Sequence, residues 1–267
     1  MKLTTPSTID TTLFNQQGYQ VFRGVLDPVV VAEVRTYLQA LVDAQVAAAC
    51  REIGCPGMPA LVEHIRRVAA GEQNALKNLS KETSDTLSGH FSTQARLSPE
   101  LLKIPRQAGL QEVLRAVLGD ERLFLHMPPT ARFVLPGNIY AAVPAHQDAV
   151  YNKHMSNFVT IWVPLVPIDD ECGGIRMFKG IAPEYPIEND PSNFWHKSVP
   201  ADGRESEDLN FAVGDLVAIH PLNVHQSRMN RSARVRFSID FRFFGGRDTS
   251  TKHHLDLQTW QVIKPKT

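Results

Sequence analysis

The segment from Val235 to Phe244 constrains the fold more than any other part of the chain, because apolar and polar side chains alternate along it. A β-strand places alternate side chains on opposite faces. One face would then pack into a core, while a polar row inside a small barrel is costly unless it lines a cavity. The apolar set is Val235, Phe237, Ile239, Phe241 and Phe243, and the polar set is Arg236, Ser238, Asp240 and Arg242.

Short apolar runs separated by Pro and Gly fill the chain after Gly119, a pattern typical of a β-sandwich or barrel. Before it, helical spacing of apolar residues predicts helices over 28–49, 59–70 and 107–118, the first capped by Asp27 and opened by Pro28. We therefore expect one α+β domain over 1–267, mainly β, with helical support over 1–120 and a β-rich core over 121–250. The polar stretch within 181–210 is long enough to predict a lid or loop insertion.

Composition excludes several classes of protein. Lys and Arg number 28, as do Asp and Glu, so no basic excess indicates nucleic-acid binding. No apolar run reaches 18 residues and no apolar leader opens the chain, so we expect neither a membrane partner nor secretion. Three cysteines form no disulfide framework, which favours a cytoplasmic protein. The sequence indicates no oligomeric state.

His146 and Asp148 stand two residues apart and would point the same way on an extended segment. A second imidazole, from His225, would complete two histidines and one carboxylate on one face of a metal, a set suited to Fe(II) with positions left open. Ten histidines make an accidental match easy, and a surface histidine beside an aspartate is the simpler explanation of the first pair alone. His220 is the rival for the third position.

Arg236 follows His225 by eleven residues, on the polar face of the strand described above, and Ser238 shares that face. A guanidinium can grip a carboxylate through two hydrogen bonds, and a serine hydroxyl can add a third. The alternative is an exposed strand whose arginines are simply solvated.

Four segments together resemble the phytanoyl-CoA dioxygenase family of Fe(II)- and 2-oxoglutarate-dependent oxygenases. They are HQDAVYN (146–152), TIWVPLVPIDDECGGIRMFKG (160–180), HQSRMNRSARVR (225–236) and, near the N-terminus, FNQQGYQVFRGVLDPVVVAEVRTYL (14–38). The resemblance implies a double-stranded β-helix (jelly-roll, cupin-like) core. It also implies that His146, Asp148 and His225 are iron ligands, because the family's closing motif fits His225 and not His220.

The same resemblance assigns the distal carboxylate of 2-oxoglutarate to Arg236, with Ser238 beside it, and places Trp162 next to the cosubstrate. A core tryptophan is the alternative for Trp162. Because Asp148 is intact, the resemblance favours hydroxylation or a related oxidation over halogenation.

The implied reaction uses Fe(II), O2 and 2-oxoglutarate, which becomes succinate and CO2 while a C–H bond of a small, polar metabolite or natural-product intermediate is oxidised. Two alternatives stay open: a metal-binding cupin-like isomerase, and a non-catalytic jelly-roll binding protein. Polar groups near the site are candidates to contact the substrate, namely His90, Tyr151, Asn152 and His154.

Overall fold

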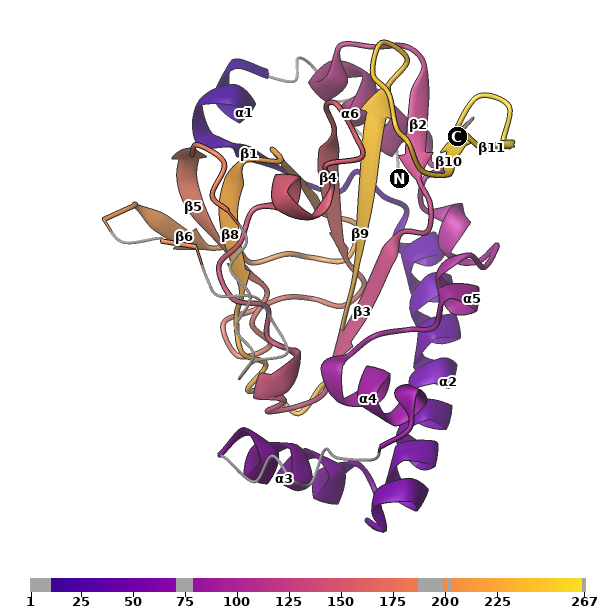
Figure 1. Ribbon diagram of the computed structural model, residues 1–267, viewed down its shortest axis with the longest axis vertical. Coiled ribbons are helices and arrows are strands. Elements are labelled where there is room, and N and C mark those ends of the chain that lie inside the picture. The colour runs from indigo at the N-terminus through magenta and orange to yellow at the C-terminus, as the bar shows by residue number, and fades with distance from the viewer. Residues whose placement is uncertain (1–10, 71–78, 187–198, 201–202, 266–267) are drawn as a thin grey trace.

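Strand β9 (Arg236–Gly245) runs through the middle of the larger of two antiparallel sheets, as Figure 1 shows. The computed structural model describes residues 11–70, 79–186, 199–200 and 203–265. Within them, the larger sheet has the order β1-β7-β4-β9-β2-β10-β11, and β3 also pairs with β9. The strands are β1 Tyr19–Phe22, β2 Leu123–His126, β3 Thr130–Val134, β4 Val159–Pro164, β7 Leu216–Ile219, β10 His254–Asp256 and β11 Val262–Ile263.

The smaller sheet has three strands in the order β6-β5-β8. They are β6 Ser206–Asp208, β5 Ile175–Ile181 and β8 Asn223–Ser227. A cavity of about 180 Å³ lies between the sheets, lined by β3, β4 and β9 on one side and by β5 and β8 on the other. Two antiparallel sheets around a cavity, with helices outside, confirm the predicted α+β class with a jelly-roll core.

Helices pack beside the larger sheet, and α2 (Pro28–Ile53) is the longest of those described (Figure 1). Its buried residues, among them Val31, Val34 and Leu38, belong to the same core as the apolar face of β9. The other α-helices are α1 Thr11–Gln17, α3 Met58–Ala69, α4 Lys81–Ser88, α5 Thr93–Arg96 and α6 Ala108–Leu118. Short 3-10 helices are η2 Leu101–Lys103, η3 Ile139–Ala141 and η4 Asp148–Tyr151.

The ends of α2 follow from its sequence. Asp27 accepts a hydrogen bond from the Val29 amide at 2.9 Å, and Pro28 occupies the first turn, as predicted. The helix extends past the expected end at residue 49 and stops at Gly54, whose left-handed backbone (φ 77°) suits glycine. The Gly54 amide donates to the carbonyl of Cys50 at 2.9 Å.

The larger sheet also takes strands from outside the range 121–250 in which the core was expected. Tyr19–Phe22 pairs with β7, and His254–Asp256 pairs with β2. These segments are too short to show a periodic pattern, so their pairing partners define them as strands. Within the expected lid, residues 187–198 and 201–202 lie outside the described part. No helix in the described ranges is both long and apolar enough to cross a bilayer.

Candidate metal centre

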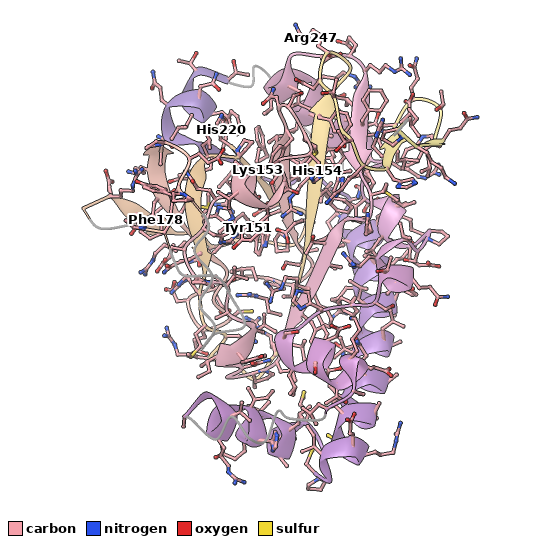
Figure 2. All side chains as sticks on the ribbon, in the orientation of Figure 1. Tyr151, Lys153, His154, Phe178, His220 and Arg247 are labelled. Carbon is pink, nitrogen blue, oxygen red and sulfur yellow. The ribbon has the colours of Figure 1, made fainter. Side chains whose placement is uncertain are left out.

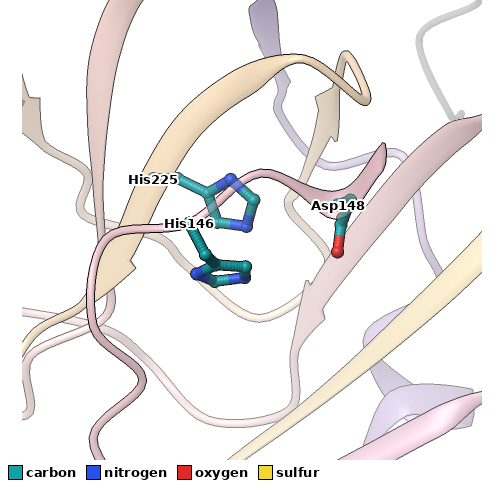
Figure 3. A group of neighbouring side chains, drawn as sticks. All are labelled: His146, Asp148 and His225. Atoms are coloured by element: carbon teal, nitrogen blue, oxygen red, sulfur yellow. The ribbon is translucent and has the colours of Figure 1, made fainter. Parts of the chain in front are cut away.

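Two histidines and one aspartate converge where the irregular segment before η4 runs beside β8 (Figure 3). His146 and His225 form an isolated antiparallel bridge, in which each backbone amide donates to the other's carbonyl at 2.9 and 3.0 Å. This pairing sets the two imidazole rings 4.3 Å apart, centre to centre. Asp148 follows two residues later at the start of η4, and the three side chains offer ligand atoms within 4.8 Å of one another.

The hydrogen bonds of both histidines leave one ring nitrogen for a metal. Nδ1 of His146 lies 2.9 Å from the carbonyl oxygen of Pro144, and Nδ1 of His225 lies 3.2 Å from that of Asn223. Because a carbonyl only accepts, each Nδ1 carries the proton and each Nε2 keeps its lone pair. Burial, together with His225, lowers the pKa of His146 to about 3, and burial also lowers the pKa of His225. Both rings are therefore neutral at physiological pH, as metal ligands must be.

The carboxylate of Asp148 is held from both sides. Thr160 donates to Oδ2 at 2.5 Å, and Arg242 donates to Oδ1 at 2.9 Å. Burial by itself would raise the pKa of Asp148, but the charge of Arg242, together with the hydrogen bond from Thr160, opposes it, and the pKa of this carboxyl lies well below its usual range. A carboxylate offers about four lone pairs, so these two bonds leave room for a metal. The donor set therefore fits Fe(II), with two imidazoles and one carboxylate on one side of it.

Arg236 lies in the same cavity, 4% exposed, and its guanidinium is fixed by backbone carbonyls. Nη1 donates to the carbonyls of Gly173, Gly174 and Arg228 at 2.7, 3.2 and 3.0 Å. A Cβ at Gly173 would stand 2.2 Å from the Met229 oxygen, and the backbone there is left-handed (φ 58°), so the paired glycines allow this close approach.

Nε of Arg236 is buried and, among the described residues, has no hydrogen-bond partner. Burial lowers the pKa of Arg236 to about 10, so the group remains a cation at neutral pH. An orphaned buried donor on a fixed cation is what a bound carboxylate would satisfy. These features fit the predicted place of 2-oxoglutarate.

The cavity contains four more of the residues named from the sequence: Ser238, Trp162, His90 and Tyr151. Trp162 is 6% exposed, and its ring lies 5.1 Å from that of Phe211, so it both lines the cavity and packs in the core. Tyr151 is 40% exposed, 5.9 Å from the ring of His146, and Figure 2 shows it near the middle of the face toward the viewer.

Asn152 and His154 are not among the residues that line the cavity. The Asn152 amide is buried and donates to the backbone carbonyl of Asp148 at 2.8 Å, which supports the turn carrying that ligand. The ring of His154 packs against that of His126, 4.5 Å away between ring centres. His220 is not part of the metal group either, and its Nδ1 accepts a hydrogen bond from the amide of Leu222.

Several residues that line the cavity or hold Asp148 were missed as site residues from the sequence. The alternation of β9 already placed Asp240 and Arg242 on the face of Arg236, and this signal could have assigned them to the site. Arg132 and Thr160 stand in short apolar strands, where a single polar residue gives no such signal. The register places Thr130 and Trp162 on either side of Asp240, and Arg132 opposite Ser238.

Comparison with known proteins agrees with this geometry. The model of the family described as phytanoyl-CoA dioxygenase (PhyH) matches residues 14–238. A curated relative, 1-deoxypentalenic acid 11-beta-hydroxylase from Streptomyces exfoliatus, is 30% identical over 149 residues, which are 49% of this chain and 52% of that protein. The chain thus matches about half the length of this relative.

Solved structures show the same fold. EvdO2 from Micromonospora carbonacea var. aurantiaca, complexed with 2-oxoglutarate, aligns with a TM-score of 0.65 at 18% identity, covering 91% of this chain and 94% of that one. The non-heme monooxygenase ThoJ aligns with a TM-score of 0.59 at 17% identity, covering 92% of this chain and 82% of that one. The epimerase SnoN, in complex with Fe3+, alpha ketoglutarate and nogalamycin RO, aligns with a TM-score of 0.59 at 16% identity. This alignment covers 90% of this chain and 84% of that one. With the family match over most of its length, the chain belongs to the phytanoyl-CoA dioxygenase family of non-haem Fe(II)- and 2-oxoglutarate-dependent oxygenases.

Proposed function

We propose that this protein hydroxylates a C–H bond of a small, polar metabolite or natural-product intermediate. The observation that carries the proposal is the placement, in one cavity, of the His146–Asp148–His225 group and an arginine with an unsatisfied buried donor. A cupin-like isomerase would need the metal group but not the carboxylate anchor at Arg236. The curated relative is named as a hydroxylase, which supports hydroxylation over the epimerisation and carbocyclisation performed by some structural neighbours.

Each residue has a separate task in this proposal. His146, Asp148 and His225 would hold Fe(II), while Arg236 and Ser238 would bind the distal carboxylate of 2-oxoglutarate and Trp162 would flank its carbon chain. Bound Fe(II) would supply the reduction of O2, coupled to conversion of 2-oxoglutarate to succinate and CO2 and to oxidation of the substrate. The protein orients these partners in a site where both histidines are neutral.

Substrate contacts come from residues around the metal group. His90 and Tyr151 line the cavity and are proposed to touch the substrate directly. Neither Asn152 nor His154 lines the cavity. We therefore propose that both act on the substrate indirectly, Asn152 through its hydrogen bond to the carbonyl of Asp148 and His154 through its contact with His126.

The first experiment is anaerobic addition of Fe(II) and 2-oxoglutarate, followed by visible spectroscopy. The expected result is a metal-to-ligand charge-transfer band that is lost in Asp148→Ala and kept in Asp43→Ala, which removes an exposed carboxylate from α2. Iron binding without the band would replace the proposal by the isomerase alternative. A band of equal strength in Asp148→Ala would show that this carboxylate is not a ligand.

A further inference from the structure

Two of the three cysteines stand on either side of the end of α2. Cys50 lies in the last turn of this helix, and Cys55 follows Gly54 in the connection to α3, at the bottom of the view in Figure 1. Both carry free thiols and line a second pocket. Among the described residues, none lines both this pocket and the metal cavity, so the two thiols form a separate group.

The turn that ends α2 brings these two side chains together. The amides of Gly54 and Cys55 both donate to the carbonyl of Cys50 at 2.9 Å. The bond from the Cys55 amide is the one that defines a Schellman turn, in which the residue after the glycine packs against the residue whose carbonyl accepts. It keeps the two Cα atoms within about 7 Å of each other, and only beyond that separation would a disulfide require the backbone to move.

The two sulfur atoms are themselves in contact. Burial, and then a hydrogen bond with the thiol of Cys55, raise the pKa of Cys50 to about 11. The Cys50 thiol is therefore protonated at neutral pH, and a protonated thiol is a poor nucleophile. Its position against Cys55, rather than reactivity of its own, suits Cys50 to complete a disulfide that Cys55 begins.

The pocket gives a small reagent access to the pair. Its volume is about 450 Å³, and its apolar lining includes Val42, Val46 and Met58. Cys50 is 7% exposed, whereas Cys55 is half-buried. A reagent that enters the pocket therefore meets Cys55 first.

A bound metal ion is a poorer explanation of the pair. A structural zinc ion takes four ligands from histidine, cysteine or acidic side chains. Within the described ranges, no third side chain of these types joins Cys50 and Cys55 at ligand distance. The pair therefore favours thiol chemistry over metal binding.

We propose that Cys50 and Cys55 form a reversible disulfide, and that a small-molecule disulfide such as oxidised glutathione is the oxidant. The Cys55 thiolate attacks one sulfur of the oxidant, the bond between its two sulfurs breaks, and one reduced glutathione leaves. Cys50 then attacks the sulfur of Cys55, and the second glutathione leaves with the proton of Cys50. Two electrons thus pass from the two cysteines to one molecule of oxidised glutathione.

This disulfide would modify the folded protein rather than support its fold. The turn is already formed with both thiols free, and the closed loop would run only from residue 50 to residue 55. Cross-links that close short loops remove little entropy from the unfolded chain, so they contribute little to stability. One reversible cross-link of this kind is therefore compatible with the absence of a disulfide framework.

The test is equilibration of the whole chain with mixtures of reduced and oxidised glutathione, followed by acid quenching, alkylation of the remaining thiols and mass spectrometry. Arg51 lies between the two cysteines, so trypsin places them on the separate peptides 36–51 and 52–66. After oxidation we expect these peptides to stay joined and to separate when a reductant is added. Cys172 is fully buried and should remain a thiol.

Three variants sharpen the assignment. Cys50→Ser should keep one glutathione attached to Cys55, because the thiol that would displace it is gone. Cys55→Ser should react about tenfold more slowly or less, because the remaining Cys50 is buried and protonated. Cys172→Ser is the matched control and should form the same cross-link as the parent protein.

Two outcomes would overturn the inference. One is a parent protein that accumulates attached glutathione to the same extent as Cys50→Ser, because two thiols in contact should release it. The other is a parent protein whose Cys50 and Cys55 both stay free in oxidised glutathione alone. If a serine variant does not fold, the joined or separate peptides of the parent protein decide. None of these measurements uses the iron centre, so failure of the proposed function would leave them unaffected.

Discussion

On one face of β9, Phe237, Ile239 and Phe241 are at most 1% exposed and pack in the main core; on the other, Arg236 and Ser238 are each 4% exposed and line the cavity. Burial therefore hardly distinguishes the two faces at the start of the strand, and further along only Asp240 and Arg242 of the polar face are half-buried. What differs is the partner of each side chain, which is apolar carbon on one face and backbone carbonyls, carboxylates or the cavity on the other. One strand thus supplies both stability and chemistry, with alternate residues assigned to each.

The largest effect should come from the apolar face. Phe241→Ala removes a fully buried ring, and we expect it to lower the free energy of unfolding by about 3–5 kcal/mol. Urea denaturation measures this, with Val262→Ala as a control because Val262 is 52% exposed. The charge-transfer band of the folded fraction should survive. A loss below about 1 kcal/mol would mean that the core near β9 can repack around the gap.

A substitution on the polar face should instead change the binding of ligands. Arg236→Gln removes the charge proposed to hold 2-oxoglutarate, and we expect the cosubstrate to bind about a hundredfold more weakly, since charged hydrogen bonds contribute about 1.5–3 kcal/mol. Titration of the band measures the affinity. The iron affinity in the absence of 2-oxoglutarate should not change. An unaltered 2-oxoglutarate affinity would remove the role assigned to Arg236.

A smaller effect is expected at Thr160, which stands on β4 opposite Arg242 of β9. Its hydroxyl donates to Oδ2 of Asp148 at 2.5 Å, so Thr160→Val keeps the shape of the side chain and removes one bond to the ligand. Groups that orient metal ligands typically change metal affinity about ten- to a hundredfold, and we expect a value near the lower end because Arg242 still holds Oδ1. Competition with a coloured chelator measures this. Thr160→Ser should restore the affinity, and failure of that rescue would argue for a packing role.

The smallest effect concerns the pH dependence of stability. Burial raises the pKa of Asp240 from its ordinary 3.8 to about 6; Arg242, Arg132 and Arg236 oppose this shift and Asp148 adds to it. The folded protein therefore binds this proton more tightly than the unfolded chain, so the associated stability is present at acid pH and is lost as pH rises through 6. Without metal or 2-oxoglutarate, the parent protein should lose about 1 kcal/mol more than Asp240→Asn between pH 5 and pH 8. Parallel pH profiles for the two proteins would contradict the raised pKa.

A strand could be predicted from the sequence where it was long enough to show alternating apolar and polar residues. The ten residues of β9 displayed it, and the family motifs located His146, Asp148 and His225. The strand that carries His225 gave no such signal, since NVHQS has no regular alternation of apolar and polar residues. It becomes a strand because it pairs with β5 and bridges to His146, and such partners are distant along the chain.

Sequence order was a poor guide to which polar residues face the cavity. Tyr151 and Asn152 are adjacent, yet Tyr151 lines the cavity while the Asn152 amide turns back to the carbonyl of Asp148. The 3-10 turn over Asp148–Tyr151 causes this difference, because it ends just before Asn152 and rotates neighbouring side chains apart.

By itself, the sequence determined the alternation of β9, the caps of α2 and the types of residue available to bind iron and 2-oxoglutarate, since these depend on neighbours within a few positions. Only the tertiary structure decided that Arg242 and Thr160 hold Asp148, that the carbonyls of Ser88 and Ala141 accept from Arg132, and that Asp240 lies within the electrostatic reach of three arginines. These contacts join segments far apart in the chain. Their charges matter because the packed sheets remove them from water, which no local pattern of residues can encode.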